Sequence, residues 1–165
     1  FAHAPAGALS FGTEAMIVNR TATPADAPTI AEFQIPMALE SEGVRLDPET
    51  VRKGVAAVFA DPSKGRYYLC ERDGKVVGCL LIAPEWSDWR NGTVWWIHSV
   101  YLEPSSRGQG LFSGLYRHIR ALAEKDPSIR GLRLYVDRGN RHAQDVYARI
   151  GMKDEHYALF EWMKP

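Results

Sequence analysis

VWWIHSVYLEPSSRGQGLFSGLYRHIR, residues 94–120, is the stretch around which the rest of the chain is arranged. Its first part, residues 94–102, is apolar, β-branched and aromatic without Pro or Gly, which predicts a strand. A turn follows at residues 103–106, and apolar residues at helical spacing then predict a helix from about Gln109. The first N–H groups of a helix have no internal partner and lie at the positive end of its dipole. This junction of strand, glycine-containing loop and helix therefore predicts an anion-binding turn.

The spacing of the glycines in this turn narrows the choice of anion. Gly108 and Gly110 allow unusual backbone angles, and Arg107 adds a positive charge. A dinucleotide-binding motif would need a third glycine where Ser113 stands, and a P-loop would need Gly-Lys followed by Ser or Thr. Both nucleotide fingerprints are therefore excluded.

Length and charge bound the class of protein. At 165 residues the chain has the size of one ordinary domain. Its 20 Lys and Arg balance 20 Asp and Glu, so no net charge draws it to nucleic acid or to an anionic membrane. No apolar run approaches the roughly 18 residues that span a bilayer. Residues 1–15 lack an initiator Met and a signal-peptide pattern, so we expect a tag remnant or flexible arm before a single domain at residues 16–165.

The two cysteines lie on either side of the Asp73-Gly74 turn. A two-residue hairpin loop at this turn would pair Cys70 with Val77. Cys79 would then lie diagonal to Cys70 on the same face, at a separation longer than a relaxed disulfide prefers. We therefore expect two free thiols in a reducing cytoplasm.

Hydrophobic periodicity, turn residues and capping residues predict the remaining elements. In chain order we expect a strand at residues 16–20, a helix from Thr23 that Pro36 kinks or ends, a polar link at residues 38–43, a helix from Asp47 to about residue 60, a hairpin of strands 66–71 and 75–83, a turn-rich connection at residues 84–92, the strand 94–102, the helix after Arg107, a strand at residues 131–136, a helix from Asn140 to about Gly151, and a closing strand at residues 156–163. This order predicts a mixed α/β fold in which residues 94–102 and 131–136 form a parallel pair.

Two motifs resemble those of one family. Residues 100–104 followed by Arg107-Gly108-Gln109-Gly110 resemble the pyrophosphate loop of the GNAT N-acetyltransferase superfamily, with Phe112 standing where the family usually has Gly or Ala. Asn140-x-x-Ala143-x-x-Val146-Tyr147-x-x-x-Gly151 looks like the family's second motif and follows at the distance that one intervening strand requires. The resemblance covers essentially residues 16–162.

The resemblance implies a fold and a cofactor. The fold would be α/β, with a mixed, mostly antiparallel central sheet, a parallel strand pair that splays apart near its ends, and flanking helices. Acetyl-CoA would lie between the splayed strands. The implied cofactor contacts are Val100, Tyr101, Leu102, Arg107, Gly108, Gln109, Gly110, Leu111, Phe112, Ser113, Asn140 and Tyr147.

Some of these contacts would carry chemistry. A backbone N–H near residues 100–102 would bind the thioester carbonyl as negative charge develops on it. Tyr147 would donate a proton to the departing thiolate, and the alternative is a core tyrosine on an apolar helix face. Asn140 would contact the pantetheine arm, and the alternative is simple helix capping. No metal site is expected.

The general base is less well defined by the sequence. His98 has an intrinsic pKa suited to the task, and the alternative is a buried structural histidine. Strand alternation places His98 with Trp96, Val100 and Leu102, and a bulge in the strand would re-aim it. Glu40 and Glu42 compete with His98, unless they form an ordinary solvated acidic loop. A water chain without a dedicated base is also allowed.

The acceptor site can be outlined from acidic and aromatic residues. The large aromatics of the 84–92 connection would either cover the core or line a binding pocket. A pocket that combined them with the acidic link would favour a cation through charge pairing and cation–π contact. The residues proposed for it are Glu40, Glu42, Asp88, Trp86, Trp89 and Trp96.

These observations lead to one function and to rivals. The chain is expected to be a cytoplasmic acyltransferase that moves an acetyl group from acetyl-CoA to a primary amine, either a small molecule or a peptide amino group, by direct attack in a ternary complex. Tyr147, His98 and Glu40 are the catalytic candidates. The alternative is a GNAT-like sensor that binds acyl-CoA without turnover. A nucleotide-binding module fails for lack of the P-loop Lys, no nucleic-acid or membrane partner is expected, and a homodimer remains open.

Overall fold

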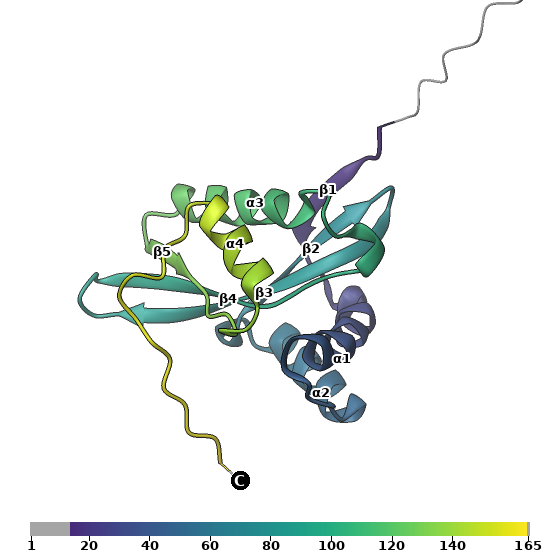
Figure 1. The fold of residues 1–165 in the computed structure, drawn as a ribbon, viewed down its shortest axis with the longest axis horizontal. Coiled ribbons are helices and arrows are strands. Elements are labelled where there is room, and N and C mark those ends of the chain that lie inside the picture. Colours follow the sequence, from purple (N-terminus) through teal and green to yellow (C-terminus); the bar gives the residue numbers. More distant parts are fainter. Residues whose placement is uncertain (1–13, 165) are drawn as a thin grey trace, which may run out of the picture.

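The computed structural model describes residues 14–164 and contains a five-stranded sheet in the order β1-β2-β3-β4-β5 (Figure 1). Neighbouring strands from β1 to β4 pair antiparallel, and β5 pairs parallel with β4. The strands are β1 (Ile17–Thr21), β2 (Arg66–Arg72), β3 (Lys75–Ser87), β4 (Gly92–Leu102) and β5 (Ile129–Arg133), and the helices are α1 (Ala27–Glu42), α2 (Pro48–Ala60), α3 (Leu111–Lys125) and α4 (Arg141–Arg149). The predicted mixed, mostly antiparallel fold is confirmed.

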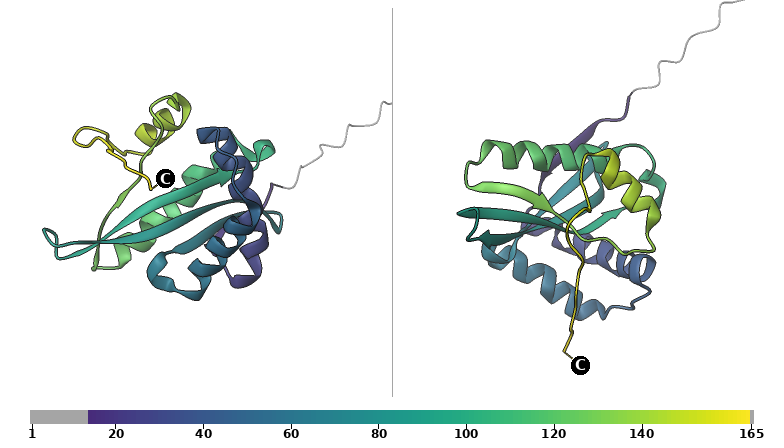
Figure 2. Two further views of the ribbon diagram at one scale, coloured as in Figure 1. Left: turned by 90° about the horizontal axis from the view of Figure 1, so that it is seen from below. Right: turned by 60° about the vertical axis from the view of Figure 1, so that its left-hand side comes forward.

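Helices cover both faces of the sheet (Figure 2). On one face, α1 and α2 pack on a core that includes Ile30 and Leu69. On the other face, α3 packs on a core that includes Leu115 and Leu80. Residues that alternate along β2 and β3 enter opposite cores, as strand geometry requires. These two cores fix the position of β4, which contributes side chains to both.

Helix α1 continues past Pro36, where the sequence predicted a kink or an end. Pro36 lies inside α1, and residues 38–42, predicted to be part of a polar link, are the last turn of the helix. Burial of Ile30, Phe33 and Ala38 supports the helix on both sides of the proline and offsets its missing hydrogen bond. Gly43 ends the helix in the left-handed conformation, with φ of 68°. Glu40 and Glu42 are therefore on a helix.

The β2–β3 hairpin has the predicted Asp73-Gly74 turn, but the predicted cysteine register is wrong. Cys70 pairs with Gly78 because the register shifts by one residue after Cys70, and Cys79 pairs with Leu69. The two cysteines consequently enter opposite cores as free thiols. Burial raises the pKa of Cys79 to about 12, so this thiol is unreactive at neutral pH.

The predicted connection at residues 84–92 is mostly strand. Strand β3 continues to Ser87 and β4 begins at Gly92, so only residues 88–91 form the turn. Pairing with β2 ends at Ile82, and Pro84 lies beyond it, where the edge of β3 that β2 had occupied is free. A proline is tolerated there because no ladder hydrogen bond is lost on that side. The long β3–β4 hairpin extends beyond the sheet (Figure 2).

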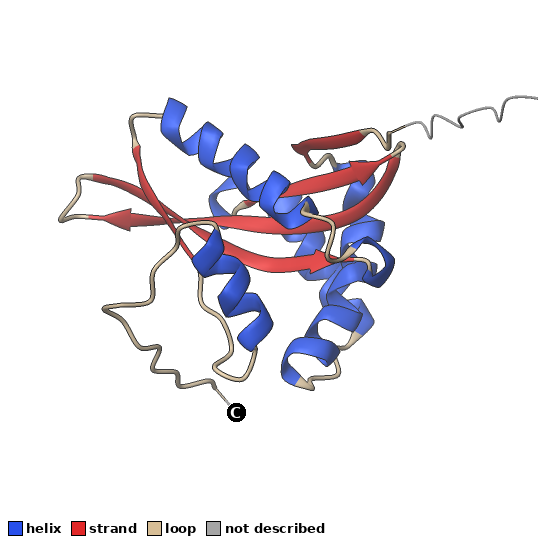
Figure 3. Cartoon of the chain, turned by 45° about the horizontal axis from the view of Figure 1, so that its top comes forward, coloured by secondary structure: helices blue, strands red, loops and turns tan. Residues whose placement is uncertain are grey.

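The C-terminal end departs from the prediction. Strand β5 ends at Arg133 instead of residue 136, and residues 156–163 form no strand (Figure 3). The large apolar side chains of this segment are exposed, with Phe160 at 93% and Trp162 at 82%. Strand propensity alone does not form a strand without a pairing partner.

Some expectations lie largely outside the described residues. The predicted arm of residues 1–15 overlaps the structure only at Glu14 and Ala15, so it stays a prediction, as does the single domain at residues 16–165. Within residues 14–164, no helix is both long and apolar enough to cross a membrane.

Candidate functional site

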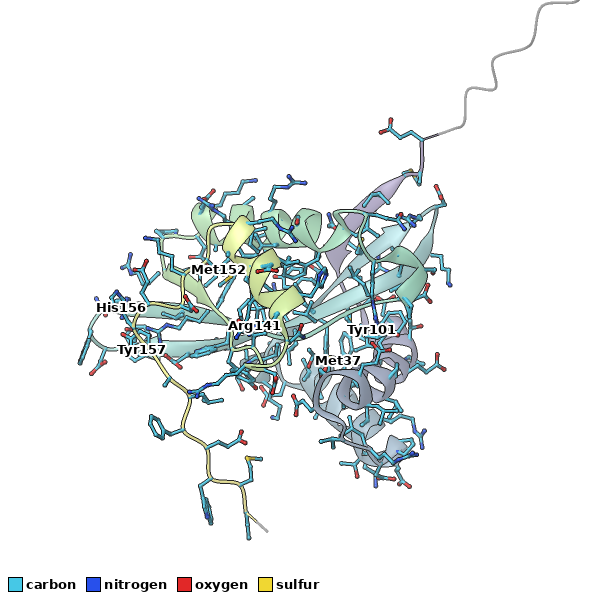
Figure 4. The ribbon with its side chains drawn as sticks, viewed as in Figure 1. Met37, Tyr101, Arg141, Met152, His156 and Tyr157 are labelled. Carbon is cyan, nitrogen blue, oxygen red and sulfur yellow. The ribbon has the colours of Figure 1, made fainter. Side chains whose placement is uncertain are left out.

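A bulge in β4 determines which side chains face each side of the sheet. The pairing with β3 passes from His98 opposite Leu81 to Tyr101 opposite Cys79, so an extra residue is accommodated in β4. Ser99 adopts φ of 50° at this point. Strand alternation alone would put His98 with Val100. The bulge moves Val100 to the α3 side and keeps His98 and Tyr101 on the α1 side, where Tyr101 packs beside Met37 (Figure 4).

Strands β4 and β5 pair only along the first part of β4. Their pairing covers Thr93 to Trp96 on β4 and ends at Arg133 on β5. Residues 97–102 of β4 therefore have no pairing with β5, and the chain after Arg133 leaves the sheet for α4 (Figure 1). The predicted splay of the parallel pair is confirmed. The unpaired backbone edge of β4 can pair with an extended ligand.

The N-terminus of α3 lies at the end of this β4 edge and lacks a side-chain cap. Gly108 and Gly110 have φ of 72° and 75°, as the glycine pattern predicted, and Gly110 is the N-cap residue. The side chain of Asp47 caps α2 and that of Asn140 caps α4, whereas no side chain caps α3 and its first turn has no acidic residue. Its first N–H groups and the positive helix dipole remain available for an anion.

The Arg107 side chain contacts residues of β4 and α1. Its Nε donates to the carbonyl of Leu102 at 2.9 Å, and its terminal nitrogen donates to Glu40 Oε2 at 2.7 Å. The guanidinium carbon also lies 5.5 Å from the ring centre of Tyr101. Arg107 and Glu40 therefore join the loop to the end of α1. Both catalytic and substrate roles predicted for Glu40 must be compatible with this ion pair.

Gln109 anchors the same loop on its other side. Its Nε2 donates to the carbonyl of Ser105 at 2.9 Å, and its Oε1 accepts a hydrogen bond from Arg72 at the end of β2. The Gln109 side chain thus braces the loop from Ser105 and Arg72.

Phe112 and Tyr147 connect α3 to α4. Their rings meet edge to face with centres 5.6 Å apart, and Phe112 also lies 6.4 Å from Tyr116. The side chain that departs from the family pattern therefore packs between helices. Tyr147 is partly buried, and burial raises its pKa, so its hydroxyl stays protonated at neutral pH. Asn140 caps α4 through its Oδ1, which accepts from the Ala143 N–H at 3.1 Å.

His98 lies in an aromatic environment on the α1 side of β4. Its ring stacks 6.2 Å from Trp96 and meets Tyr135 edge to face at 5.4 Å. Burial lowers the pKa of His98 below its ordinary value, so the imidazole is neutral at pH 7 and keeps a lone pair.

The structure does not bring the predicted acceptor residues together. Glu40 lies near Tyr101 at one end of β4, whereas Trp86 pairs with Thr93 near the other end, about 26 Å away along the strand. Trp89, on the same hairpin turn as Asp88, is 89% exposed. Glu42 is exposed in the last turn of α1.

Trp96 has neighbours that were not predicted as site residues. They are Glu85 on β3, Arg133 on β5 and Tyr135 just beyond β5. Alternation along residues 131–136 places Arg133 and Tyr135 on one face. This was the available sequence signal for them.

Comparison with known proteins matches the chain to acetyltransferases. A model of the acetyltransferase (GNAT) family matches residues 31–152, which include the 107–110 loop and Tyr147. The chain is 32% identical over 79 residues to the thialysine N-epsilon-acetyltransferase of Bos taurus, covering 48% of this chain and 45% of that protein. The chain spans less than half the length of the curated relatives it matches.

Solved structures extend the likeness to most of the chain. A possible acetyltransferase from Clostridium difficile 630 has a TM-score of 0.84 and 38% identity, covering 90% of this chain and 98% of that chain. A predicted acetyltransferase from Clostridium acetobutylicum, solved with acetyl-CoA, has a TM-score of 0.69 and 19% identity, covering 91% of this chain and 96% of that chain. The second likeness is one of fold.

Proposed function

The chain belongs to the acetyltransferase (GNAT) family, and on that premise we propose that it transfers an acetyl group from acetyl-CoA to a primary amine within a ternary complex. The proposal rests on two adjoining stretches of backbone that lack hydrogen-bonding partners from the rest of the sheet or from a capping side chain. The β4 edge at residues 97–102 lacks a β5 partner, and the adjoining N-terminus of α3 lacks a side-chain cap. Together they suit a ligand with an extended amide-containing arm and a pyrophosphate.

The kinds of groups present at the loop and along β4 support acetyl-CoA as the ligand. Backbone N–H groups of residues 108–113 would hold the pyrophosphate, with Leu111, Phe112 and Ser113 in the first helical turn. The β4 edge would pair with the pantetheine arm. Asn140 uses its oxygen to cap α4, so its amide NH2 is the group that would donate to that arm. When bound, acetyl-CoA supplies an activated thioester.

The chemistry requires a base, an acid and an oxyanion donor. His98 would accept the proton from the acceptor ammonium, because its lowered pKa keeps it neutral. A backbone N–H near Tyr101, displaced by the bulge at Ser99, would stabilise the negative charge on the carbonyl oxygen. As the amine nitrogen formed the C–N bond and the C–S bond broke, Tyr147 would donate its proton to the thiolate and would then recover the second proton that the nitrogen loses.

Glu40 is less suited than His98 to act as the base. Its carboxylate is paired with Arg107, and this contact already has a structural use in joining α1 to the loop. Glu40 and Glu42 remain candidates for attracting the cationic acceptor from the end of α1. The name of the bovine relative supports an amine acceptor. A cytoplasmic location also remains part of this proposal.

Replacement of Tyr147 by phenylalanine tests the catalytic assignment. We expect kcat to fall by about 100-fold or more while the Kd for CoA stays within a factor of about three, because only the proton donor is removed. Tyr116→Phe is the matched control, since Tyr116 contacts Phe112 from within the core and has no assigned role. Its kcat should be unchanged.

The outcomes separate the enzyme from the sensor. Full activity of the Tyr147→Phe variant would refute the acid role. If the intact protein bound CoA but acetylated no amine in a broad panel, the non-catalytic acyl-CoA sensor would replace the enzyme. If CoA did not bind, the site itself would be wrong.

A further inference from the structure

A compact group of side chains lies on the α1-side face of β4 and β5, next to the proposed base. Trp96 and His98 come from β4, and Arg133 and Tyr135 come from β5 and the chain just after it. Trp96 lies 6.2 Å from Tyr135 and 5.8 Å from the guanidinium carbon of Arg133. We call these four residues and Glu85 on β3 the aromatic patch. Tyr135 is 54% exposed, so the patch is accessible.

One end of the aromatic patch carries a fixed pair of opposite charges. Glu85 Oε1 accepts from Arg133 at 3.2 Å, and Glu85 Oε2 accepts from the Trp96 indole N–H at 2.7 Å. Arg133 lies over the Trp96 ring on one side, and its guanidinium carbon is 5.5 Å from the Tyr157 ring. These contacts hold both charges in place while the Arg133 and Glu85 side chains remain 31% and 45% exposed.

The other end of the aromatic patch is His98, which carries no charge at neutral pH. Arg133 pairs with Trp96, and His98 lies two residues farther along β4, which corresponds to about 7 Å. The Trp96 ring lies between the charged end and His98. The aromatic patch therefore offers a cation and an anion together, then an apolar surface, then a base.

We propose that the aromatic patch binds the acetyl acceptor as a free α-amino acid whose unbranched side chain ends in a second amine. Arg133 binds the α-carboxylate, Glu85 binds the α-ammonium group, and the methylene stem packs on Trp96 and Tyr135. The terminal amine then reaches His98, since four methylene groups and an amine span about 6–8 Å when extended. The inference rests on the proposed acetyl transfer and specifies its acceptor.

The charge pair is what distinguishes this acceptor from other amines. A simple diamine lacks the carboxylate, and a lysine within a peptide has neither head-group charge. Neither analogue offers both an anion to Arg133 and a cation to Glu85. In the transfer, His98 would take one proton from the terminal ammonium, and the neutral nitrogen would bond to the acetyl carbon as the C–S bond breaks. Tyr147 would give its proton to the thiolate, and the second proton that the nitrogen loses would return Tyr147 to its neutral form.

Acceptor competition tests the proposal directly. The acceptors are lysine, cadaverine, which lacks the carboxylate, and Nα-acetyl-lysine N-methylamide, whose head group is neutral. We expect kcat/KM for lysine to exceed that for either analogue at least tenfold. Arg133→Gln should lower the lysine-to-cadaverine ratio at least tenfold. Arg130 lies on the same strand but donates hydrogen bonds to the backbone carbonyls of Arg90 and Asn91 in the β3–β4 turn. Arg130→Gln should therefore leave the ratio unchanged.

Several results would overturn the proposal. An unchanged ratio in Arg133→Gln, or a blocked lysine used as well as lysine, would show that the charge pair does not select the acceptor. Should no amine be acetylated, the proposed function fails, and calorimetric binding of lysine to CoA-saturated protein decides the inference. Binding that is lost in Arg133→Gln and kept in Arg130→Gln supports the aromatic patch, and no binding to the intact protein excludes it.

Discussion

Replacing Gly110 with alanine should destabilise the protein through the backbone alone. Gly110 has φ of 75° and ψ of 7°, and a Cβ added there would meet no atom within 4 Å. The substitution therefore creates no clash, and its cost is that of an L-residue in the left-handed region, about 1–2 kcal/mol. For a chain of this size, about 1 kcal/mol corresponds to a fall in Tm of roughly 2–4 °C.

The matched control is a glycine in ordinary helical conformation. Gly54 is exposed inside α2, has no positive φ, and also has nothing within 4 Å of an added Cβ. Gly54→Ala should raise the free energy of unfolding by about 0.5–1 kcal/mol, because alanine loses less conformational entropy in a helix. The two substitutions add the same methyl group and should shift stability in opposite directions.

Urea denaturation and calorimetry of both variants measure the difference. If the first turn of α3 holds a pyrophosphate, Gly110→Ala should also weaken CoA binding, and about 1 kcal/mol of residual strain in the complex corresponds to roughly a fivefold rise in Kd. A Gly110→Ala variant at least as stable as the unaltered protein would refute the left-handed turn. Unchanged CoA affinity despite the expected loss of stability would place the phosphate elsewhere.

Two further predictions concern His98 and Asn140. If His98 is the base, kcat/KM should fall as the pH drops below 6.5, because burial lowers the pKa of His98 and protonation removes its lone pair. The inflection in the pH profile should vanish in His98→Ala. An inflection above 6.5 that persists in this variant would contradict the assignment. Asn140→Ala should lower the free energy of unfolding by about 1 kcal/mol, because α4 loses its cap. Asn140→Asp keeps the capping oxygen and the stability, but it should weaken CoA binding because the NH2 donor is lost. Equal CoA affinity in Asn140→Asp would limit Asn140 to capping.

Features governed by local sequence were predicted well. The Asp73-Gly74 turn, the glycine turn at residues 108–110 and the helix that follows depend on the conformations of a few neighbouring residues. The parallel pairing of β4 and β5 followed from a short strand–helix–strand segment. Nearby interactions are sufficient to specify such elements, so their positions can be read from composition and spacing.

Features that depend on distant partners were predicted poorly. Residues 38–43 were expected to form a polar link, but tertiary burial carries α1 past Pro36 to Glu42. Residues 156–163 have strand-forming side chains and pair with no strand in the structure. The expected acceptor set separated because β3 and β4 extend the hairpin and carry Trp86 and Trp89 away from Glu40.

The sequence by itself determined the backbone of the proposed anion site, because its strand, glycine turn and helix are formed by consecutive residues. Only the tertiary structure decided which side chains meet there. The bulge at Ser99 separates Val100 from His98, and the end of β4–β5 pairing at Trp96 and Arg133 brings Tyr135 beside His98. When one residue is added to a strand, every later side chain moves to the opposite face of the sheet. Whether a bulge accommodates the added residue depends on the pairing with the partner strand.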